Sequence, residues 1–242
     1  MQIWAHRGAS AMAPENTLRA FEAALSPEMA VEGIEFDVHL SADGVPVVCH
    51  DEDIKRTSDG RGKIAQFTYE ELLAFDFSRV NKRSFDVGVC RIPRLEEVLE
   101  LVRASDKRAN IELKTDKNPY PGIEEAVVRA VRDMGLEERV VVSSFREESV
   151  LRTKTFAPCI ETAFLFVRPP RGLHQMIREE RWNAVHPRYS RVSPALVADA
   201  HAHGMQVRAY TVDDAKQALR LASLGVDGIF SNDPAAMIAA LA

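Results

Sequence analysis

Two histidines with charged neighbours are the residues of this sequence best suited to catalysis. His6 follows a short apolar run and precedes Arg7, while His50 closes another apolar run and precedes an aspartate. Glu35 and Asp37 lie between them in the chain, two residues apart. Histidines titrate near neutral pH and suit general acid and base catalysis, whereas carboxylates suit a metal ion. Together these residue types predict metal-assisted chemistry on a phosphate ester.

Strand geometry is expected to bring three carboxylates together. Glu35 and Asp37 share one face of a strand because their spacing is two, and Glu112 has the equivalent place in a later strand. The apolar residues that alternate with them are expected to face the helices: Ile34, Phe36, Val38, Ile111 and Leu113. Three converging negative charges are costly unless a cation neutralises them, and Mg²⁺ and Ca²⁺ prefer oxygen ligands. The alternative is that these acidic residues only cap loops or pair with lysine and arginine.

Arg7 and Lys114 add positive charge to the same rim. Guanidinium and ammonium groups bind the nonbridging oxygens of a phosphate and stabilise charge that develops there. The alternative for both is a salt bridge to the carboxylates. A metal site with two histidines and two cations favours phosphoryl chemistry over sugar or peptide hydrolysis.

Composition excludes several classes of protein. The chain has 242 residues, 46% of them apolar, which is enough for a large buried core. A formal net charge of -5 with scattered basic residues argues against a nucleic-acid surface. Candidate chemistry by residue 6 leaves no room for a signal peptide, and no stretch is long and apolar enough to cross a membrane, so we expect a soluble cytoplasmic protein without stable membrane insertion. Cys49, Cys90 and Cys159 lack metal-like spacing and are expected to be reduced thiols. The oligomeric state stays open.

Alternating strand-like and helix-like segments predict the fold. Eight apolar runs of strand length occur at 2–6, 33–38, 109–114, 140–144, 161–166, 182–186, 206–211 and 227–231. Helical patterns fall between them, at 14–25, 94–103, 123–134, 147–156, 194–203 and 213–224. Eight β/α units at this length predict a TIM (β/α)8 barrel, with its active site at the carboxyl ends of the strands. A doubly wound open sheet is the competing architecture.

One long connection interrupts this alternation. Residues 41–93 exceed a simple connection between a strand and a helix, and we interpret about 51–92 as a small insertion within a single domain of residues 1–242. Asp43-Gly44 near its start predicts a hairpin. A hairpin centred on that pair would place Asp37 opposite His50.

The other five histidines have a simpler interpretation. We expect His39 to be exposed at the surface; the alternative, since it shares the alternation of Glu35 and Asp37, is that it is an extra polar group at the site. His174, His186, His201 and His203 are expected to form ordinary hydrogen bonds at the edge of the core.

Several ordered motifs resemble those of the glycerophosphodiester phosphodiesterase family, in particular its cytoplasmic bacterial members. They are His6-Arg7-Gly8, Pro14-Glu15-Asn16-Thr17, Glu35-Phe36-Asp37-Val38, Asp43-Gly44 with His50-Asp51, and Ile111-Glu112-Leu113-Lys114. The similarity continues through Ser144-Phe145, Tyr210-Thr211-Val212 and Asp227-Gly228-Ile229, nearly to the end of the chain.

The resemblance implies a TIM barrel with an insertion after the second strand, and a role for each candidate residue. His6 and His50 would be the acid/base pair; Glu35, Asp37 and Glu112 would hold a divalent cation, Mg²⁺ or Ca²⁺; and Arg7 and Lys114 would contact phosphate. Which histidine is the acid stays open. The nucleophile, water or the glycerol hydroxyl of the substrate, stays open as well.

The resemblance also implies roles for Asn16 and Tyr210. Asn16 would orient His6 or the site by hydrogen bonding, or alternatively begin a helix. Tyr210 stands where the family often carries tryptophan, so the wall around the glycerol is expected to be smaller or more polar. The implied function is metal-dependent hydrolysis of small-molecule glycerophosphodiesters to sn-glycerol 3-phosphate and an alcohol. Alternatives are a lysophospholipase D acting on lipid phosphodiesters and a noncatalytic phosphoglycerol-binding protein.

Overall fold

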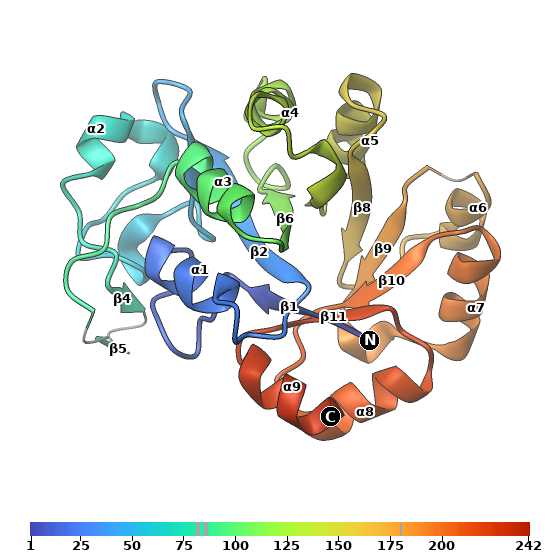
Figure 1. The fold of residues 1–242 in the computed structure, drawn as a ribbon. Helices are drawn as coiled ribbons and strands as arrows, with labels where there is room; N and C mark the ends of the chain where they lie inside the picture. The colour runs from blue at the N-terminus through green and yellow to red at the C-terminus, as the bar shows by residue number, and fades with distance from the viewer. Residues whose placement is uncertain (81–82, 85–86, 180) are drawn as a thin grey trace.

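A closed parallel barrel forms the centre of the protein (Figure 1). The computed structural model describes residues 1–80, 83–84, 87–179 and 181–242. Within them, eight parallel strands follow one another around the barrel in chain order: β1 (Gln2–His6), β2 (Gly33–Leu40), β6 (Arg108–Leu113), β7 (Val140–Ser144), β8 (Glu161–Phe166), β9 (Ala184–Pro187), β10 (Gln206–Ala209) and β11 (Gly228–Ser231). β1 pairs with both β2 and β11, which closes the barrel. The predicted TIM barrel is therefore confirmed, and an open sheet is excluded.

Helices surround the barrel on the outside (Figure 1). They are α1 (Leu18–Leu25), α3 (Leu95–Ala104), α4 (Ile123–Asp133), α5 (Glu147–Phe156), α6 (Leu173–Arg178), α7 (Pro194–Ala202), α8 (Ala215–Ser223) and α9 (Pro234–Leu241), with short 3₁₀ turns η3 (Glu137–Arg139) and η4 (Tyr189–Arg191). The predicted helix at 14–25 begins later than expected, at Leu18. Asn16 has a positive φ of 56°, and the Thr17 hydroxyl accepts a hydrogen bond from the Ala20 amide as the N-cap. None of the described helices is long and apolar enough to span a membrane.

The apolar core lies mainly between the strands and the helices. The outward-facing residues of β2 and β6 are buried there as predicted: Ile34, Phe36, Val38, Ile111 and Leu113. A smaller apolar cluster fills the inside of the barrel, formed by Trp4, Val141, Ala163, Ala184 and Phe230. This cluster separates the inward-facing polar residues at the amino ends of the strands from those at the carboxyl ends.

A charged cluster lies inside the barrel toward the amino ends of the strands. The Arg208 side chain is fully buried, and its Nη1 donates to Glu161 Oε1 at 2.7 Å while Nε donates to Gln2 Oε1 at 3.1 Å. Arg108 Nη2 donates to the other oxygen of Glu161 at 2.7 Å. Two arginines thus neutralise one carboxylate that would otherwise be costly to bury.

The long connection after β2 begins as a hairpin, but in a different register from the predicted one. β3 (Pro46–Val48) pairs antiparallel with β2, with Val38 opposite Val48, so that Asp37 lies opposite Cys49 and not His50. The Ser41 amide donates to the Val45 carbonyl at 3.0 Å, which leaves a three-residue loop with Gly44 at φ 78°. A left-handed third residue is typical of three-residue hairpin loops, whereas the prediction assumed a two-residue loop.

The rest of this connection packs on its own apolar cluster beside α1 and α3 (Figure 1). It contains η1 (Ile54–Arg56), η2 (Ile64–Gln66), α2 (Tyr69–Leu72), β4 (Arg79–Val80) and β5 (Arg83–Ser84). The cluster includes the fully buried Ile54, Ile64 and Leu72. These contacts give η1 a fixed position next to the carboxyl end of β2.

Candidate active site

Three buried carboxylates meet at the carboxyl ends of β2 and β6. Asp37 lies opposite Glu112 in the strand register, and Glu35 precedes Asp37 on the same face. One oxygen atom of each lies within 4.8 Å of those of the others, and all three side chains are buried. Burial and the negative charge of Asp37 raise the pKa of Glu35 well above its ordinary value, and burial also raises the pKa of Glu112. Asp37 Oδ1 accepts no hydrogen bond. Three clustered oxygen donors, one with a free lone pair, fit a hard divalent cation.

Arg7 and Lys114 pair with these carboxylates. Lys114 Nζ lies 2.7 Å from Glu112 Oε1 and 3.5 Å from Asp37 Oδ1. The backbone N–H of Arg7 donates to Glu35 Oε2 at 2.9 Å, and the side-chain Nε of Arg7 lies 3.6 Å from Asp37 Oδ2. The salt bridges that the sequence offered as the alternative are therefore present. They also hold both cations at the edge of the carboxylate cluster.

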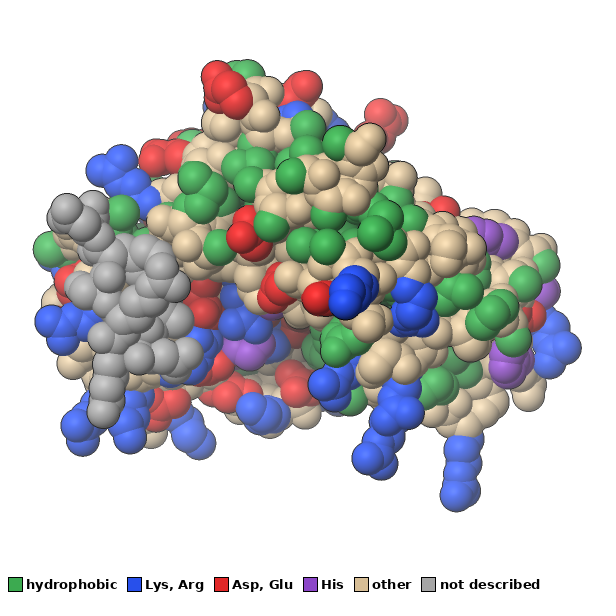
Figure 2. All heavy atoms as spheres, turned by 90° about the horizontal axis from the view of Figure 1, so that it is seen from below, with side chains coloured by type: hydrophobic (Ala, Val, Ile, Leu, Met, Phe, Trp, Pro, Cys, Tyr) green, Lys and Arg blue, Asp and Glu red, His purple; other side chains and the backbone are tan. Residues whose placement is uncertain are grey.

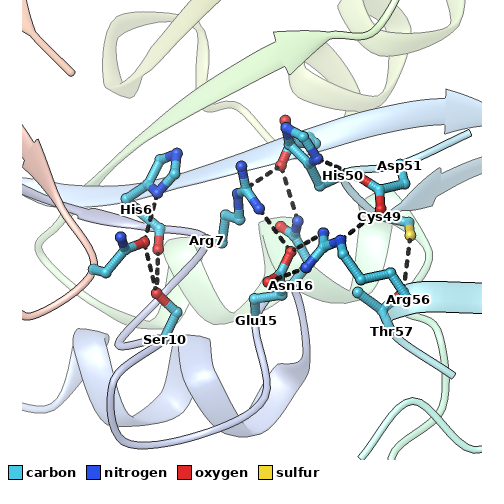
Figure 3. Close-up of polar contacts among 12 residues, drawn as sticks. His6, Arg7, Ser10, Glu15, Asn16, Cys49, His50, Asp51, Arg56 and Thr57 are labelled. Atoms are coloured by element: carbon cyan, nitrogen blue, oxygen red, sulfur yellow. Dashed lines mark hydrogen bonds and ion pairs between the residues drawn. The ribbon is translucent and has the colours of Figure 1, made fainter. Parts of the chain in front are cut away.

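His6 is held at the carboxyl end of β1 by a residue that the sequence analysis missed (Figure 3). Its Nδ1 lies 2.8 Å from Asn232 Oδ1, and Asn232 Nδ2 donates to Asp213 Oδ2 at 2.7 Å. Because that amide orientation makes Asn232 Oδ1 an acceptor, His6 Nδ1 carries the proton. Burial, reinforced by the charge of Arg7, lowers the pKa of His6 to about 4. The Nε2 lone pair, 3.9 Å from Glu35 Oε2, is therefore free to accept a proton.

His50 belongs to a chain of alternating charges that reaches Arg7 (Figure 3). Its Nδ1 lies 2.6 Å from Asp51 Oδ1, and Asp51 Oδ2 accepts from Arg56 Nε. Arg56 binds Glu15 with both terminal nitrogens, at 2.7 and 2.8 Å, and Glu15 Oε1 accepts from Arg7 Nη1 at 2.8 Å. Although burial opposes it, these arginines lower the pKa of Glu15. The two histidine-bearing halves of the rim are thus linked through Arg56.

Of the two hydrogen-bonding roles that the resemblance implied for Asn16, toward His6 or toward the rest of the site, the structure has the second. Its side-chain Nδ2 donates to Asp37 Oδ2 at 2.9 Å, and its backbone N–H donates to the backbone carbonyl of Arg7 at 3.0 Å. Asn16 therefore orients a carboxylate and not His6, and the neighbouring Thr17 caps the helix. Gly8 has φ 79°, and a Cβ there would lie 2.7 Å from the Ala20 backbone. Only glycine fits this turn without displacing α1.

A small cavity of about 130 Å³ opens between the histidines. Its walls include His6, His50, Asn110, Phe145, His186 and Tyr210. The Tyr210 ring meets Phe145 edge to face, with centroids 5.8 Å apart. In Figure 2, acidic, basic and histidine side chains gather in a hollow of the face seen from below.

The expectation that His39 is exposed is wrong. Its side chain is fully buried, with Nδ1 3.0 Å from the Tyr120 hydroxyl and Nε2 3.2 Å from the His50 carbonyl. His39 supports the backbone of His50 and is not itself a wall of the cavity. His174, His201 and His203 make ordinary hydrogen bonds as expected, although His174 and His201 are exposed and not at the edge of the core, whereas His186 is fully buried inside the barrel.

The sequence matches the Glycerophosphoryl diester phosphodiesterase family over residues 6–236. The chain belongs to this family. A glycerophosphodiester phosphodiesterase of Caldanaerobacter subterraneus subsp. tengcongensis is 39% identical over 240 residues, covering 98% of this chain and 96% of the relative. One from Bacillus altitudinis is 40% identical over 238 residues, covering 96% and 95%.

Solved structures of the family share the fold. An Oleispira antarctica phosphodiesterase, determined in complex with the product sn-glycerol-3-phosphate, superposes with a TM-score of 0.86 at 30% identity. The superposition covers 100% of this chain and 96% of that protein. The sequence comparisons and the structural superposition thus both relate this chain to glycerophosphodiester phosphodiesterases with the same barrel.

Proposed function

We propose that this chain hydrolyses glycerophosphodiesters to sn-glycerol 3-phosphate and an alcohol. The observation that carries the proposal is the buried cluster of Glu35, Asp37 and Glu112, with His6 and His50 beside it on one cavity. The named relatives, and the product bound to the Oleispira antarctica enzyme, support the substrate class.

Glu35, Asp37 and Glu112 would hold a divalent cation, Mg²⁺ or Ca²⁺. A bound cation supplies Lewis acidity toward phosphate oxygen and neutralises developing charge. Arg7 and Lys114 bind the nonbridging phosphate oxygens through their donors at the edge of the cluster. Asn16 keeps one oxygen of Asp37 in place, since its amide donates to Oδ2.

The two histidines divide the proton transfers. His6 Nε2 takes a proton from the attacking water or glycerol hydroxyl, because Asn232 occupies Nδ1 and burial keeps the ring neutral. Attack by water gives sn-glycerol 3-phosphate directly, whereas attack by the glycerol hydroxyl gives a cyclic phosphate that water then opens to sn-glycerol 3-phosphate. His50 donates a proton to the leaving alcohol as its bond to phosphorus breaks, with Asp51 holding its Nδ1. Tyr210 forms part of the wall around the glycerol.

We also propose that residues 1–242 form a single domain, with about 51–92 as an insertion beside the cavity. The separate apolar cluster of that segment supports this division. Three unpaired cysteines support a reducing, cytoplasmic location.

Glycerophosphocholine hydrolysis with enzymatic detection of sn-glycerol 3-phosphate tests the function. We expect activity that is lost in EDTA, returns with Mg²⁺ or Ca²⁺, and falls with Glu112→Gln. Full activity after exhaustive chelation would remove the metal from the proposal. Turnover of lysophosphatidylcholine alone would favour a lysophospholipase D, and product binding without turnover would favour a noncatalytic binder.

A further inference from the structure

Buried polar atoms without a partner concentrate around the cavity. Among the described residues, eight buried side-chain nitrogen or oxygen atoms lack a hydrogen bond. Six belong to the carboxylate cluster, to its hydrogen-bond partner Asn16 or to the cavity wall: Arg7 Nε, Asn16 Oδ1, Asp37 Oδ1, Asn110 Oδ1, His186 Nδ1 and Tyr210 Oη. Because such atoms are rare in folded proteins, their concentration at one place indicates a ligand that binds them. Arg7, Asn16 and Asp37 already have roles beside the proposed metal and phosphate. The polar atoms of Asn110, His186 and Tyr210 have none so far, since Tyr210 was assigned only as part of the cavity wall.

His186 lines the cavity and has one ring nitrogen, Nδ1, without a hydrogen-bond partner. Its Nε2 lies 3.4 Å from Arg208 Nη1, and a guanidinium can only donate, so Nε2 accepts and Nδ1 carries the proton. Burial, with the charge of Arg208, lowers the pKa of His186 well below its ordinary value and keeps the ring neutral. The Nδ1–H group is fully buried and has no acceptor.

Asn110 and Tyr210 complete a complementary set. Asn110 Nδ2 donates to Ser143 Oγ at 2.9 Å, which leaves Oδ1 as a free acceptor. The Tyr210 hydroxyl can both donate and accept. The three residues come from β6, β9 and the end of β10, and they line the same cavity as Phe145 and Phe230.

We propose that Asn110, His186 and Tyr210 form a subsite for the hydroxyl groups of the substrate's glycerol moiety. An alcohol must donate and accept at the same oxygen, and these residues supply an acceptor, a donor and a hydroxyl between apolar walls. This inference rests on the proposed function and deepens it, because the subsite selects unsubstituted glycerol over a glycerol whose hydroxyl carries an acyl chain.

Ligand titration of the Mg²⁺-loaded protein tests the subsite without turnover. sn-Glycerol 3-phosphate and n-propyl phosphate share the phosphate but differ in two hydroxyl groups. We expect wild-type protein to prefer glycerol phosphate by about tenfold or more, since each retained hydrogen bond contributes up to about tenfold. His186→Phe and Tyr210→Phe should each reduce that preference by about threefold or more, with propyl phosphate binding unchanged.

Tyr189→Phe is the matched control, because it removes a tyrosine hydroxyl outside the cavity wall. Equal binding of both phosphates by wild-type protein, or an unchanged preference in both variants, would overturn the subsite and indicate that ordered water alone meets these atoms. Retained propyl phosphate binding shows that a variant is folded. If glycerophosphocholine is not hydrolysed, the proposed function fails while the preference for glycerol phosphate still decides the subsite.

Discussion

Arg56 links the two halves of the polar network, so replacing it with lysine tests whether the network positions catalytic groups. Its guanidinium makes three charge-assisted hydrogen bonds, one to Asp51 and two to Glu15. Lysine keeps the charge but cannot bind both carboxylates with the same geometry. After allowance for partial exposure and the retained charge, we expect Arg56→Lys to cost about 1–2 kcal/mol of unfolding free energy.

Catalysis should suffer more than this stability loss implies. Asp51 would be free to turn away from His50, and Glu15 would hold Arg7 without its second partner. We expect kcat for glycerophosphocholine to fall about tenfold or more, because general acid catalysis depends on a positioned proton donor. The melting temperature should fall by about 2–8 °C.

Steady-state kinetics and thermal unfolding of purified protein measure both effects. Arg61→Lys is the control, since Arg61 is an exposed arginine of the same segment. A kcat for Arg56→Lys equal to that of the control would refute the positioning role. A lower melting temperature with normal kcat would show that the network serves stability alone.

Three other predictions address thiols, the tight turn and the buried ion pair. Iodoacetamide should alkylate only Cys159 in native protein, as intact mass would show, because the other two cysteines are buried; labelling of all three would contradict the packing. Gly8→Ala should cost about 2–4 kcal/mol in denaturant unfolding, since its Cβ would meet the Ala20 backbone at positive φ; a change under about 0.5 kcal/mol would contradict the close contact. Against burial, two arginines lower the pKa of Glu161, so its stabilisation is present above the unfolded-state pKa of about 4.3 and is lost as pH falls through the folded value. The stability difference between wild type and Glu161→Gln should therefore shrink in acid, and a difference independent of pH would contradict this reasoning.

The barrel and its inward carboxylates were predictable because strand alternation is a local property. Glu35, Asp37 and Glu112 follow directly from a period of two, and neighbouring parallel strands then bring them together. The hairpin register was not predictable to one residue, because Asp43-Gly44 suits both two-residue and three-residue loops. One residue of difference placed Cys49, and not His50, opposite Asp37.

Residues that act through long-range contacts were missed. Asn232 meets His6 across 226 residues of sequence, a contact that exists only because β11 closes the barrel against β1. Its position directly after the last strand was the available signal. Arg56 gave no periodic signal, since it lies in a 3₁₀ turn of the long connection.

The full burial of His39 and His186 was also not predicted. His39 shares the inward alternation of β2, yet its partners are the Tyr120 hydroxyl and the His50 carbonyl, which come from other segments. His186 looked like an ordinary core residue until the barrel placed Arg208 against one ring nitrogen and the cavity against its ring. In both cases the tertiary partner, and not the local sequence, decides the role of the side chain.

The most direct test of the central claim is the rate at which His6→Ala and His50→Ala release sn-glycerol 3-phosphate from glycerophosphocholine, measured beside wild type at saturating divalent cation. We predict that each variant loses about 100-fold or more in kcat while its melting temperature stays close to that of wild type. Release by either folded variant at the wild-type rate would contradict the assignment of this histidine pair as the acid and base.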